Sequence, residues 1–202
     1  MKLYFHPFSG SSRRVLLTAA HLDLPLERIV VDLPTGEHRG EAHASRNPNR
    51  RVPVLDDNGF LLWESRAIMQ YLAEGTALYP GEKRARADVN RWLFWCAAHM
   101  SPTNTVFVVE NFVKARAGRE PDPVELARGE ALAKEHYAVL DGHLAGKTWI
   151  AQEQLTLADF SIAATFALVG PAKLPVESYG NLRAWLERVQ ELAAWRQTTP
   201  QR

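Results

Sequence analysis

Two short stretches of this chain carry residue types suited to holding a small peptide. The first is Arg51-Val-Pro-Val-Leu55. Pro53 has no backbone N–H, so it belongs at the mouth or edge of a strand, where a proline is also able to be cis. Proline pushes the residue before it toward extended geometry. The backbone N–H and C=O of Val52 are therefore expected to face a ligand rather than a neighbouring strand.

The second stretch, Trp63-Glu-Ser-Arg-Ala67, places Ser65 where a helix should begin. A helix start offers free N–H groups and partial positive charge, which favour a carboxylate. Glu64 adds an acceptor suited to an ammonium group. Together the two residues predict a site for a small peptide with a free α-amino acid end.

Three hydroxyl groups stand close together near the N-terminus. Ser9, Ser11 and Ser12 precede the run Arg13-Arg-Val15. Ser12 stands immediately before the expected first turn of a helix, which predicts it as the N-cap. Ser9 and Ser11 then remain as hydrogen-bond donors for a bound group. The alternative is that all three serines only cap the helix and its turn.

The first 75 residues change pattern repeatedly, as strands and helices alternate. Runs of β-branched and aromatic residues predict strands, helical spacing predicts helices, and Asp57-Asn-Gly59 predicts a hairpin turn. The expected strands are Lys2–Phe5, Ile29–Val31, Val52–Asp56 and Phe60–Trp63, and the expected helices contain Arg13–Ala20 and Ile68–Leu72. This order predicts an α/β first domain, residues 1–75, built on a mixed sheet.

Residues 75–83, which include Pro80-Gly81, predict a linker, and strand signals are almost absent beyond it. Residues 84–202 are therefore expected to form an all-helical domain. The signals are helical spacing across Arg86–Phe112, a helix from Pro123 or Val124 to about Leu144, a capping box at Thr156-Leu-Ala-Asp159, and Asn181 as the cap of the last helix.

The composition argues against several classes of protein. A formal net charge of +1 gives no reason to expect nucleic acid or an anionic membrane as a partner. No apolar run approaches the roughly 18 residues of a membrane span, and no export segment is recognised, so a cytoplasmic protein is expected. The only cysteine, Cys96, lies in an apolar helix and is expected to be a buried structural thiol. The histidines and acids show no spacing suited to a metal.

In this order, the motifs resemble the glutathione S-transferases, and most of all the serine-type, theta- and phi-like bacterial groups. The strand Lys2–Phe5, the serine loop Ser9–Val15 and Gly36-Glu-His38 all have counterparts in that family, and the resemblance covers the whole chain. It implies a thioredoxin-like N-terminal domain with a mixed four-stranded sheet, followed by an all-α C-terminal domain. It also implies glutathione as the co-substrate and no metal.

The resemblance assigns roles to individual residues. It places the thiol-activating hydroxyl at Ser9, with Ser11 as a candidate second donor. The glutathione-binding set would be His38, Arg39, Arg51, Val52, Pro53, Glu64 and Ser65, with the basic residues meeting the glycyl carboxylate. The electrophile pocket would include Phe8, His99 and Phe107, for which core packing is the alternative. At Asn47-Pro-Asn-Arg50 the chain departs from the family's usual Asn-Pro-Phe-Gly, which makes this loop more polar and more basic.

Glutathione chemistry requires a thiolate near neutral pH. An ordinary thiol has a pKa of about 8.5, so lowering it by ~2 units takes about 3 kcal/mol. A hydrogen bond to a charged group supplies roughly 1.5–3 kcal/mol, and a helix N-terminus adds about 0.3–1 kcal/mol. One serine hydroxyl at the start of the first helix therefore nearly suffices, and the serine itself stays protonated.

The leading hypothesis is a cytoplasmic detoxification transferase that conjugates glutathione to a small hydrophobic electrophile, and the resemblance implies a homodimer. A glutathione-dependent isomerase of the zeta kind is an alternative, although that group carries a cysteine in the loop that is Ser9–Ser12 here. A disulfide reductase or a peroxidase would use the same thiolate. The alternative of another class is a non-catalytic glutathione-binding or regulatory protein.

Overall fold

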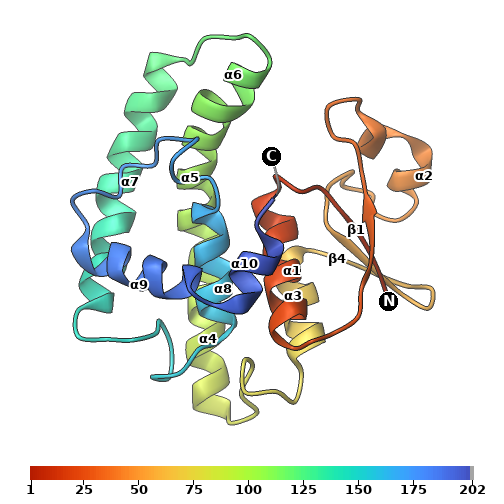
Figure 1. Ribbon diagram of the computed structural model, residues 1–202, viewed down its shortest axis with the longest axis horizontal. Helices are drawn as coiled ribbons and strands as arrows, with labels where there is room; N and C mark the ends of the chain where they lie inside the picture. Colours follow the sequence, from red (N-terminus) through yellow and green to blue (C-terminus); the bar gives the residue numbers. More distant parts are fainter. Residues whose placement is uncertain (201–202) are drawn as a thin grey trace.

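A four-stranded mixed sheet forms one side of the molecule in the computed structural model, which describes residues 1–200 (Figure 1). The strands are β1 (Lys2–Phe5), β2 (Glu27–Val30), β3 (Val54–Asp57) and β4 (Phe60–Trp63), in the order β2-β1-β3-β4. Strand β2 is parallel to β1, whereas β3 is antiparallel to both β1 and β4. The predicted thioredoxin-like sheet is confirmed.

The register of this sheet gathers the predicted ligand-binding segments at one edge. Tyr4 pairs with Val54, and Val54 pairs with Trp63, so the end of β1, the start of β3 and the end of β4 lie side by side. Strand β2 ends at the same edge because Val30 pairs with Phe5. The segments that leave the sheet from this edge are the serine loop, the Val52-Pro53 turn and the Glu64-Ser65 helix start.

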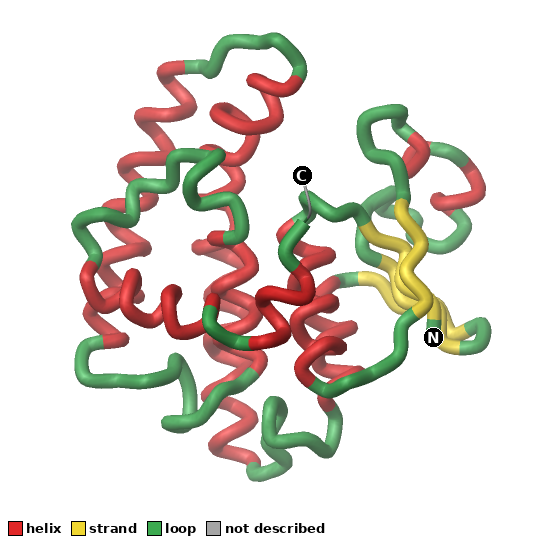
Figure 2. Tube along the Cα trace, in the orientation of Figure 1, coloured by secondary structure: helices red, strands yellow, loops and turns green. Residues whose placement is uncertain are grey.

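Two helices lie between the sheet and the rest of the chain (Figures 1 and 2). They are α1 (Gly10–His21) and α3 (Ser65–Ala73), which pack on each other. The apolar side chains that they share with the strands include Leu3, Phe5, Val15, Leu16, Leu55 and Ile68. Helix α1 begins at Gly10 rather than near Arg13, whereas α3 begins at Ser65 as expected. Two short helices, η1 (Glu37–Arg39) and α2 (Glu41–Ala44), precede β3.

The second half of the described chain is helical. One long rod passes through α4 (Lys83–Trp95), α5 (Ser101–Phe107) and α6 (Lys114–Arg116), which are joined by the π-helical segments η2 (Cys96–Met100) and η3 (Val108–Val113). Helix α7 (Pro123–Leu144) follows the rod in the chain and packs against α5. The remaining elements are α8 (Leu157–Ala163), η4 (Ala164–Phe166), α9 (Gly180–Gln190) and α10 (Ala193–Thr198). The predicted all-α second half is confirmed.

A capping box starts α8, as the sequence predicts. The Thr156 hydroxyl accepts from the Ala158 N–H at 3.3 Å, and the Asp159 carboxylate accepts from the Thr156 N–H at 2.9 Å. Burial raises the pKa of the Asp159 carboxyl to about 6, while hydrogen bonds from the Ile150 backbone N–H and the Trp185 indole N–H act in the opposite direction. The box therefore lies in the core and ties α8 to its neighbours.

The prediction that Asn181 caps the last helix is wrong. Helix α9 begins at Gly180, α10 follows it, and the Asn181 side-chain amide donates to the Asp141 carbonyl oxygen at 3.2 Å. The Asp141 carboxylate accepts from the Leu182 N–H at 2.9 Å. A side chain of α7 therefore supplies the cap of α9, which no local sequence pattern indicates.

The helical half and the sheet-bearing half share one buried cluster. Leu17 of α1 and Met69 of α3 belong to the same cluster as Trp92 and Tyr137 of the helical half. Helix α1 also packs against α8, η4 and α10. The helical half therefore fixes the position of the helix that carries the serine loop. Among residues 1–200, no helix is both long and apolar enough to cross a bilayer.

Candidate active site

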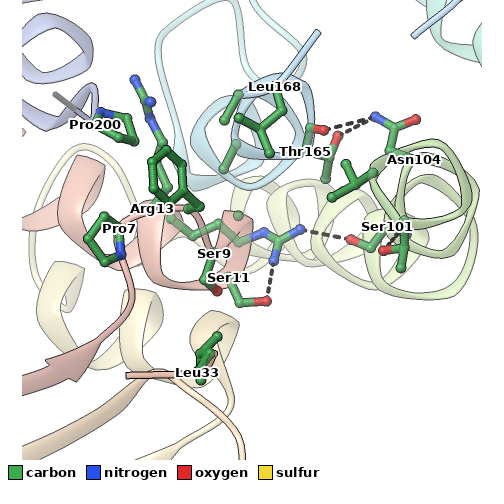
Figure 3. Close-up of a pocket in the computed structure, with 17 residues that line it drawn as sticks. Pro7, Ser9, Ser11, Arg13, Leu33, Ser101, Asn104, Thr165, Leu168 and Pro200 are labelled. Carbon is green, nitrogen blue, oxygen red and sulfur yellow. Dashed lines mark hydrogen bonds between the residues drawn. The ribbon is translucent and has the colours of Figure 1, made fainter. Parts of the chain in front are cut away.

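A cavity of about 280 Å³ opens between the serine loop and the helical half. Its walls come from the loop before α1, the first turns of α1, α5 and the segment around η4 (Figure 3). The polar side chains that line it include Ser9, Ser11, Arg13, Arg14, Ser101 and Asn104. Among the described residues that line the cavity, none carries a carboxylate. The cavity therefore offers hydrogen-bond donors and cations to whatever enters it.

Ser9 stands at the N-terminus of α1 and faces this cavity. It is the N-cap residue, with extended backbone, and its side-chain oxygen accepts from the Ser12 N–H at 3.2 Å. Because the oxygen acts as the acceptor in this bond, the hydroxyl proton stays available to a second group. The amides of Gly10 and Ser11, at the first positions of the helix, have no intrahelical acceptor. This end of α1 can therefore hold an anion.

The other two serines behave differently from each other. Ser12 is fully buried, and its hydroxyl oxygen accepts from the His6 N–H at 3.2 Å. The prediction that Ser12 is the N-cap is wrong, because α1 begins earlier and turns this side chain into the core. Ser11 lines the cavity, and its oxygen accepts from the Arg14 guanidinium at 3.1 Å. The hydroxyl proton of Ser11 is thus also available to a ligand.

Gly10 allows α1 to start where it does. A Cβ at this position would lie 3.0 Å from the backbone carbonyl oxygen of Ala164, in η4. Real Cβ atoms rarely come that close to a neighbour, and here the neighbour is backbone rather than a flexible side chain. The close approach of α1 to η4, which forms one corner of the cavity, therefore depends on glycine.

The Val52-Pro53 turn presents free backbone at the same sheet edge. The peptide bond between the two residues is cis. Strand β3 begins only at Val54, and no backbone hydrogen bond to Val52 is found among residues 1–200. The preceding carbonyl, that of Arg51, accepts from the His43 imidazole at 3.0 Å and from the Asn47 amide at 2.8 Å. These two buried side chains hold the turn in place.

Glu64 and Ser65 complete the edge. Glu64 is exposed and has a φ of +71°, a conformation that non-glycine residues rarely adopt and that is often found at functional sites. Ser65 is the first residue of α3 and is 5% exposed. The pair therefore offers a carboxylate beside a helix N-terminus, as the sequence predicts.

A second, more open cavity of about 390 Å³ carries the basic residues. It is lined by His38, Arg39, Asn49, Arg50 and Arg51. Burial lowers the pKa of His38, and the charges of Arg39 and Arg51 lower it further, so this imidazole is neutral at pH 7. Its Nδ1 is buried without a partner among the described residues. Arg50 stands where the family pattern has glycine, takes a φ of +54° and donates to the Arg39 carbonyl. This cavity is suited to a carboxylate.

Of the three expected electrophile-pocket residues, only Phe8 lines the cavity. It packs against the ring of Phe112 at 5.8 Å, with the Arg116 guanidinium 5.2 Å from its ring centre. His99 is exposed and lies 5.1 Å, ring to ring, from His136.

Phe107 is 3% exposed and packs in the core, where its ring would be 3.2 Å from a Cβ at Gly129. The expectation that His99 and Phe107 line this cavity is corrected accordingly. Helical spacing gives the faces of a helix but does not say which neighbour each face meets.

Arg13 and Arg14 are the cavity residues whose positions the sequence does not reveal. Both are almost fully buried, and burial lowers the pKa of each guanidinium to about 10, so both stay charged at neutral pH. Arg13 donates to the Trp195 carbonyl at 3.1 Å and lies over the Trp195 ring at 4.1 Å. Arg14 donates from Nε to the Ser161 carbonyl at 2.9 Å. The sequence signal that could have identified them is a pair of charged residues inside an otherwise apolar helix.

Within residues 1–200 no group of three or more His, Cys, Asp or Glu side chains is placed to hold a metal ion. The described site instead combines an anion-binding helix start, free backbone at the Val52 turn, and a separate basic cavity. Such a set can bind a peptide with carboxylates and stabilise a negative charge beside Ser9.

Two family models match the chain. The model described as "Glutathione S-transferase, N-terminal domain" matches residues 1–74, and the one described as "Glutathione S-transferase, C-terminal domain" matches residues 123–188. The first span holds the serine loop, the Val52 turn and the Glu64-Ser65 helix start. The second holds α7, α8 and most of α9.

Solved structures agree with the chain over nearly its whole length. Glutathione transferase F7 from Populus trichocarpa is 26% identical, has a TM-score of 0.90 and matches over 98% of this chain and 96% of its own. A glutathione S-transferase from Pseudomonas fluorescens is 28% identical, with a TM-score of 0.86 and 96% of each chain covered. A protein from Rhodopseudomonas palustris, described as a possible glutathione S-transferase, is 29% identical, with a TM-score of 0.85 over 100% of this chain and 98% of its own.

Proposed function

Because this chain belongs to the glutathione S-transferase family, we propose that it conjugates the thiol of glutathione to a small hydrophobic electrophile. The observation that carries the proposal is the N-terminus of α1, where the Ser9 hydroxyl and the first amides of the helix face a cavity. Ser9 keeps its proton free for a sulfur atom because its oxygen is already used as an acceptor. Such a helix start favours a thiolate over a thiol.

The sheet edge supplies the rest of the glutathione site in this proposal. The free N–H and C=O of Val52, next to Pro53, pair with the peptide backbone of the ligand. The helix start at Ser65 receives the α-carboxylate of the γ-glutamyl end, and Glu64 accepts from its ammonium group. The basic cavity of His38, Arg39 and Arg51 receives the glycyl carboxylate.

Ser9 is the proposed thiol-activating residue and Ser11 the second donor. A charge-assisted hydrogen bond stabilises the thiolate by roughly 1.5–3 kcal/mol, and the helix start adds about 0.3–1 kcal/mol. These terms together reach the ~3 kcal/mol that lowers an ordinary thiol pKa by about 2 units. The acceleration of the transfer then comes from the thiolate and from holding both reactants together.

The electrophile occupies the apolar part of the cavity in this proposal. Phe8, Val108, Ala167 and Leu168 line that part. The cavity volume of about 280 Å³ falls at the small end of ligand pockets, which favours a small electrophile. By analogy with the family, the proposal extends to a cytoplasmic homodimer that acts in detoxification.

The experiment compares conjugation of a chromogenic aryl halide by the wild-type protein and by Ser9→Ala, Ser11→Ala and Ser178→Ala. Ser178 is an exposed serine that does not line the cavity, so its variant is the matched control. We expect Ser9→Ala to lose at least about tenfold in turnover, which corresponds to about 1.4 kcal/mol of lost transition-state stabilisation. We expect Ser178→Ala to match the wild type.

Binding to immobilised glutathione is measured on the same variants. Because the sheet edge is untouched in Ser9→Ala, this variant should still bind the column. Near-normal turnover in Ser9→Ala with a loss in Ser11→Ala would move the activating role to Ser11. Binding without turnover by the wild type, over a broad panel of electrophiles, would contradict the transferase proposal and favour a non-catalytic glutathione-binding protein.

A further inference from the structure

Two guanidinium groups from the sheet-bearing half converge on the same spot in the helical half. Arg14 of α1 and Arg66 of α3 both donate to the Ser101 hydroxyl oxygen, each at 2.8 Å. Both also donate to Ser161 of α8. Arg14 donates to the Ser161 carbonyl oxygen at 2.9 Å, and Arg66 donates to the Ser161 hydroxyl oxygen at 3.2 Å. The fifth member of this group, Cys96, is fully buried between them.

These two cations have no carboxylate partner among the described residues. The ion pairs found within residues 1–200 include neither Arg14 nor Arg66. Arg14 is 3% exposed, and the one carboxylate whose charge raises the pKa of this guanidinium is that of the exposed Glu64. A buried cation without an anion is costly, because no water screens or solvates it. An anion is therefore expected at the point where the two guanidinium groups meet.

The Cys96 sulfur stands at that point. It lies 3.1 Å from the Arg66 guanidinium, 3.9 Å from that of Arg14 and 3.6 Å from the Ser101 hydroxyl. Burial by itself raises the pKa of the Cys96 thiol, but the charges of Arg14 and Arg66, together with hydrogen bonds from Arg66 and Ser101, outweigh burial and bring the pKa below its ordinary value. The Ser161 carbonyl oxygen lies 3.4 Å from the Cys96 sulfur and also receives the Arg14 Nε–H.

The same arginine reaches the cavity. While one branch of the Arg14 guanidinium faces Cys96, the other donates to the Ser11 oxygen at 3.1 Å. In Figure 3, dashed lines mark the hydrogen bonds of this guanidinium to Ser11 and to Ser101. Anything that fixes Arg14 therefore fixes Ser11 as well.

We propose that Cys96 is a buried thiolate, the counter-ion of Arg14 and Arg66, and that by holding Arg14 it positions Ser11 at the cavity. The first part concerns the charge of Cys96 alone, and the second part rests on the proposed transferase function. Cys96 is a positioning residue here: its sulfur faces Arg14 and Arg66 rather than the substrate. The charged and polar groups around it are Arg14 from α1, Arg66 from α3, Ser101 from α5 and Ser161 from α8, and the charge of Glu64 acts on Arg14.

The ultraviolet absorbance of the thiolate tests the first part. Because the chain has one cysteine, the difference spectrum between the wild type and Cys96→Ser reports Cys96 alone. We expect the folded protein to keep thiolate absorbance at pH 7, which lies below the ordinary thiol pKa of about 8.5. In denaturant the absorbance should return to the ordinary titration. A folded protein whose thiolate signal appears only above about pH 8.5 would overturn the proposal.

Conjugation rates test the second part, with Cys96→Asp as the variant that keeps a negative charge. We expect Cys96→Ser to lower kcat about fivefold, which is the effect of losing one positioned hydrogen bond, here that of the Ser11 hydroxyl to the substrate. We expect Cys96→Asp to restore much of the lost kcat. Retention on immobilised glutathione should not change. In a Ser11→Ala background, Cys96→Ser should have no further effect on kcat. Equal loss in that background, or no rescue by aspartate in variants with wild-type circular dichroism, would overturn the positioning role.

The thiolate absorbance and the conjugation rate distinguish failure of the buried-thiolate proposal from failure of the proposed transferase function. A wild-type protein without conjugation activity but with thiolate absorbance at pH 7 would refute the transferase function and leave the buried thiolate standing. An active protein without that absorbance would refute the buried thiolate.

Discussion

Replacing Gly10 by alanine should destabilise the protein and damage the cavity, although alanine is the better helix former. The new Cβ would meet the Ala164 carbonyl oxygen at 3.0 Å, so α1 and η4 must move apart by a few tenths of an ångström. Overpacking of this kind costs about 1–3 kcal/mol. The helix propensity of alanine returns at most about 1 kcal/mol at this first helical position. We therefore expect a net loss of about 1–2 kcal/mol.

Gly142→Ala is the matched control. Gly142 lies near the end of α7, and a Cβ there would meet nothing within 4 Å, so only the propensity term remains and we expect a gain of about 0.5–1 kcal/mol. Urea unfolding measures both variants, and the aryl halide assay measures their turnover. Because Gly10 borders the cavity, its variant should also lose activity, whereas Gly142→Ala should not. If Gly10→Ala proved as stable and as active as Gly142→Ala, the close approach of α1 to η4 would not be what requires glycine.

Three further outcomes are expected. The stability of the wild type relative to Cys96→Ser should rise with pH up to about 8.5. The pKa of Cys96 is lowered in the folded protein, so between the folded pKa and the unfolded pKa the unfolded chain holds a proton that the folded chain has lost. The stability that the Cys96 thiolate contributes is therefore lost as the pH falls through the folded pKa. Urea unfolding at several pH values checks it, and a pH-independent difference would contradict it. Thr156→Ala should cost about 1–2 kcal/mol in unfolding free energy, because it removes a buried N-cap. Arg51→Ala should raise KM for glutathione about tenfold with kcat kept, while Arg28→Ala, an exposed arginine on β2, should change neither.

The sheet and its binding edge could be predicted because their signals are local. Proline at the mouth of a strand, Asp57-Asn-Gly59 between two apolar runs, and Ser65 at a helix start each depend on the conformation of a few neighbouring residues. The mixed four-stranded sheet and the capping box of α8 follow from such signals. The antiparallel register then brings the separate segments together, without any further information from the side chains.

The helix caps and side-chain surroundings that could not be predicted depend on contacts with residues distant in sequence. The serine loop contains three residues that are all acceptable N-caps, and the contact of Gly10 with Ala164 decides among them. Asn181 has the composition of a cap, but Asp141 from another helix takes that role. His99 lies on a stretch with apolar neighbours, yet its side chain is exposed and does not line the cavity.

Helix α1 connects the two sides of the proposed reaction. Its N-terminal end presents Ser9 and Ser11 to the cavity, while Arg13 and Arg14, further along the helix, are buried and bond the helical half. The helical half also forms the wall against which the electrophile would lie. A shift in how the two halves pack must therefore move the sulfur-binding hydroxyls and the electrophile wall together, because interfaces packed this closely transmit displacement. In the proposed reaction, the position of the thiolate and the shape of the electrophile pocket are therefore coupled.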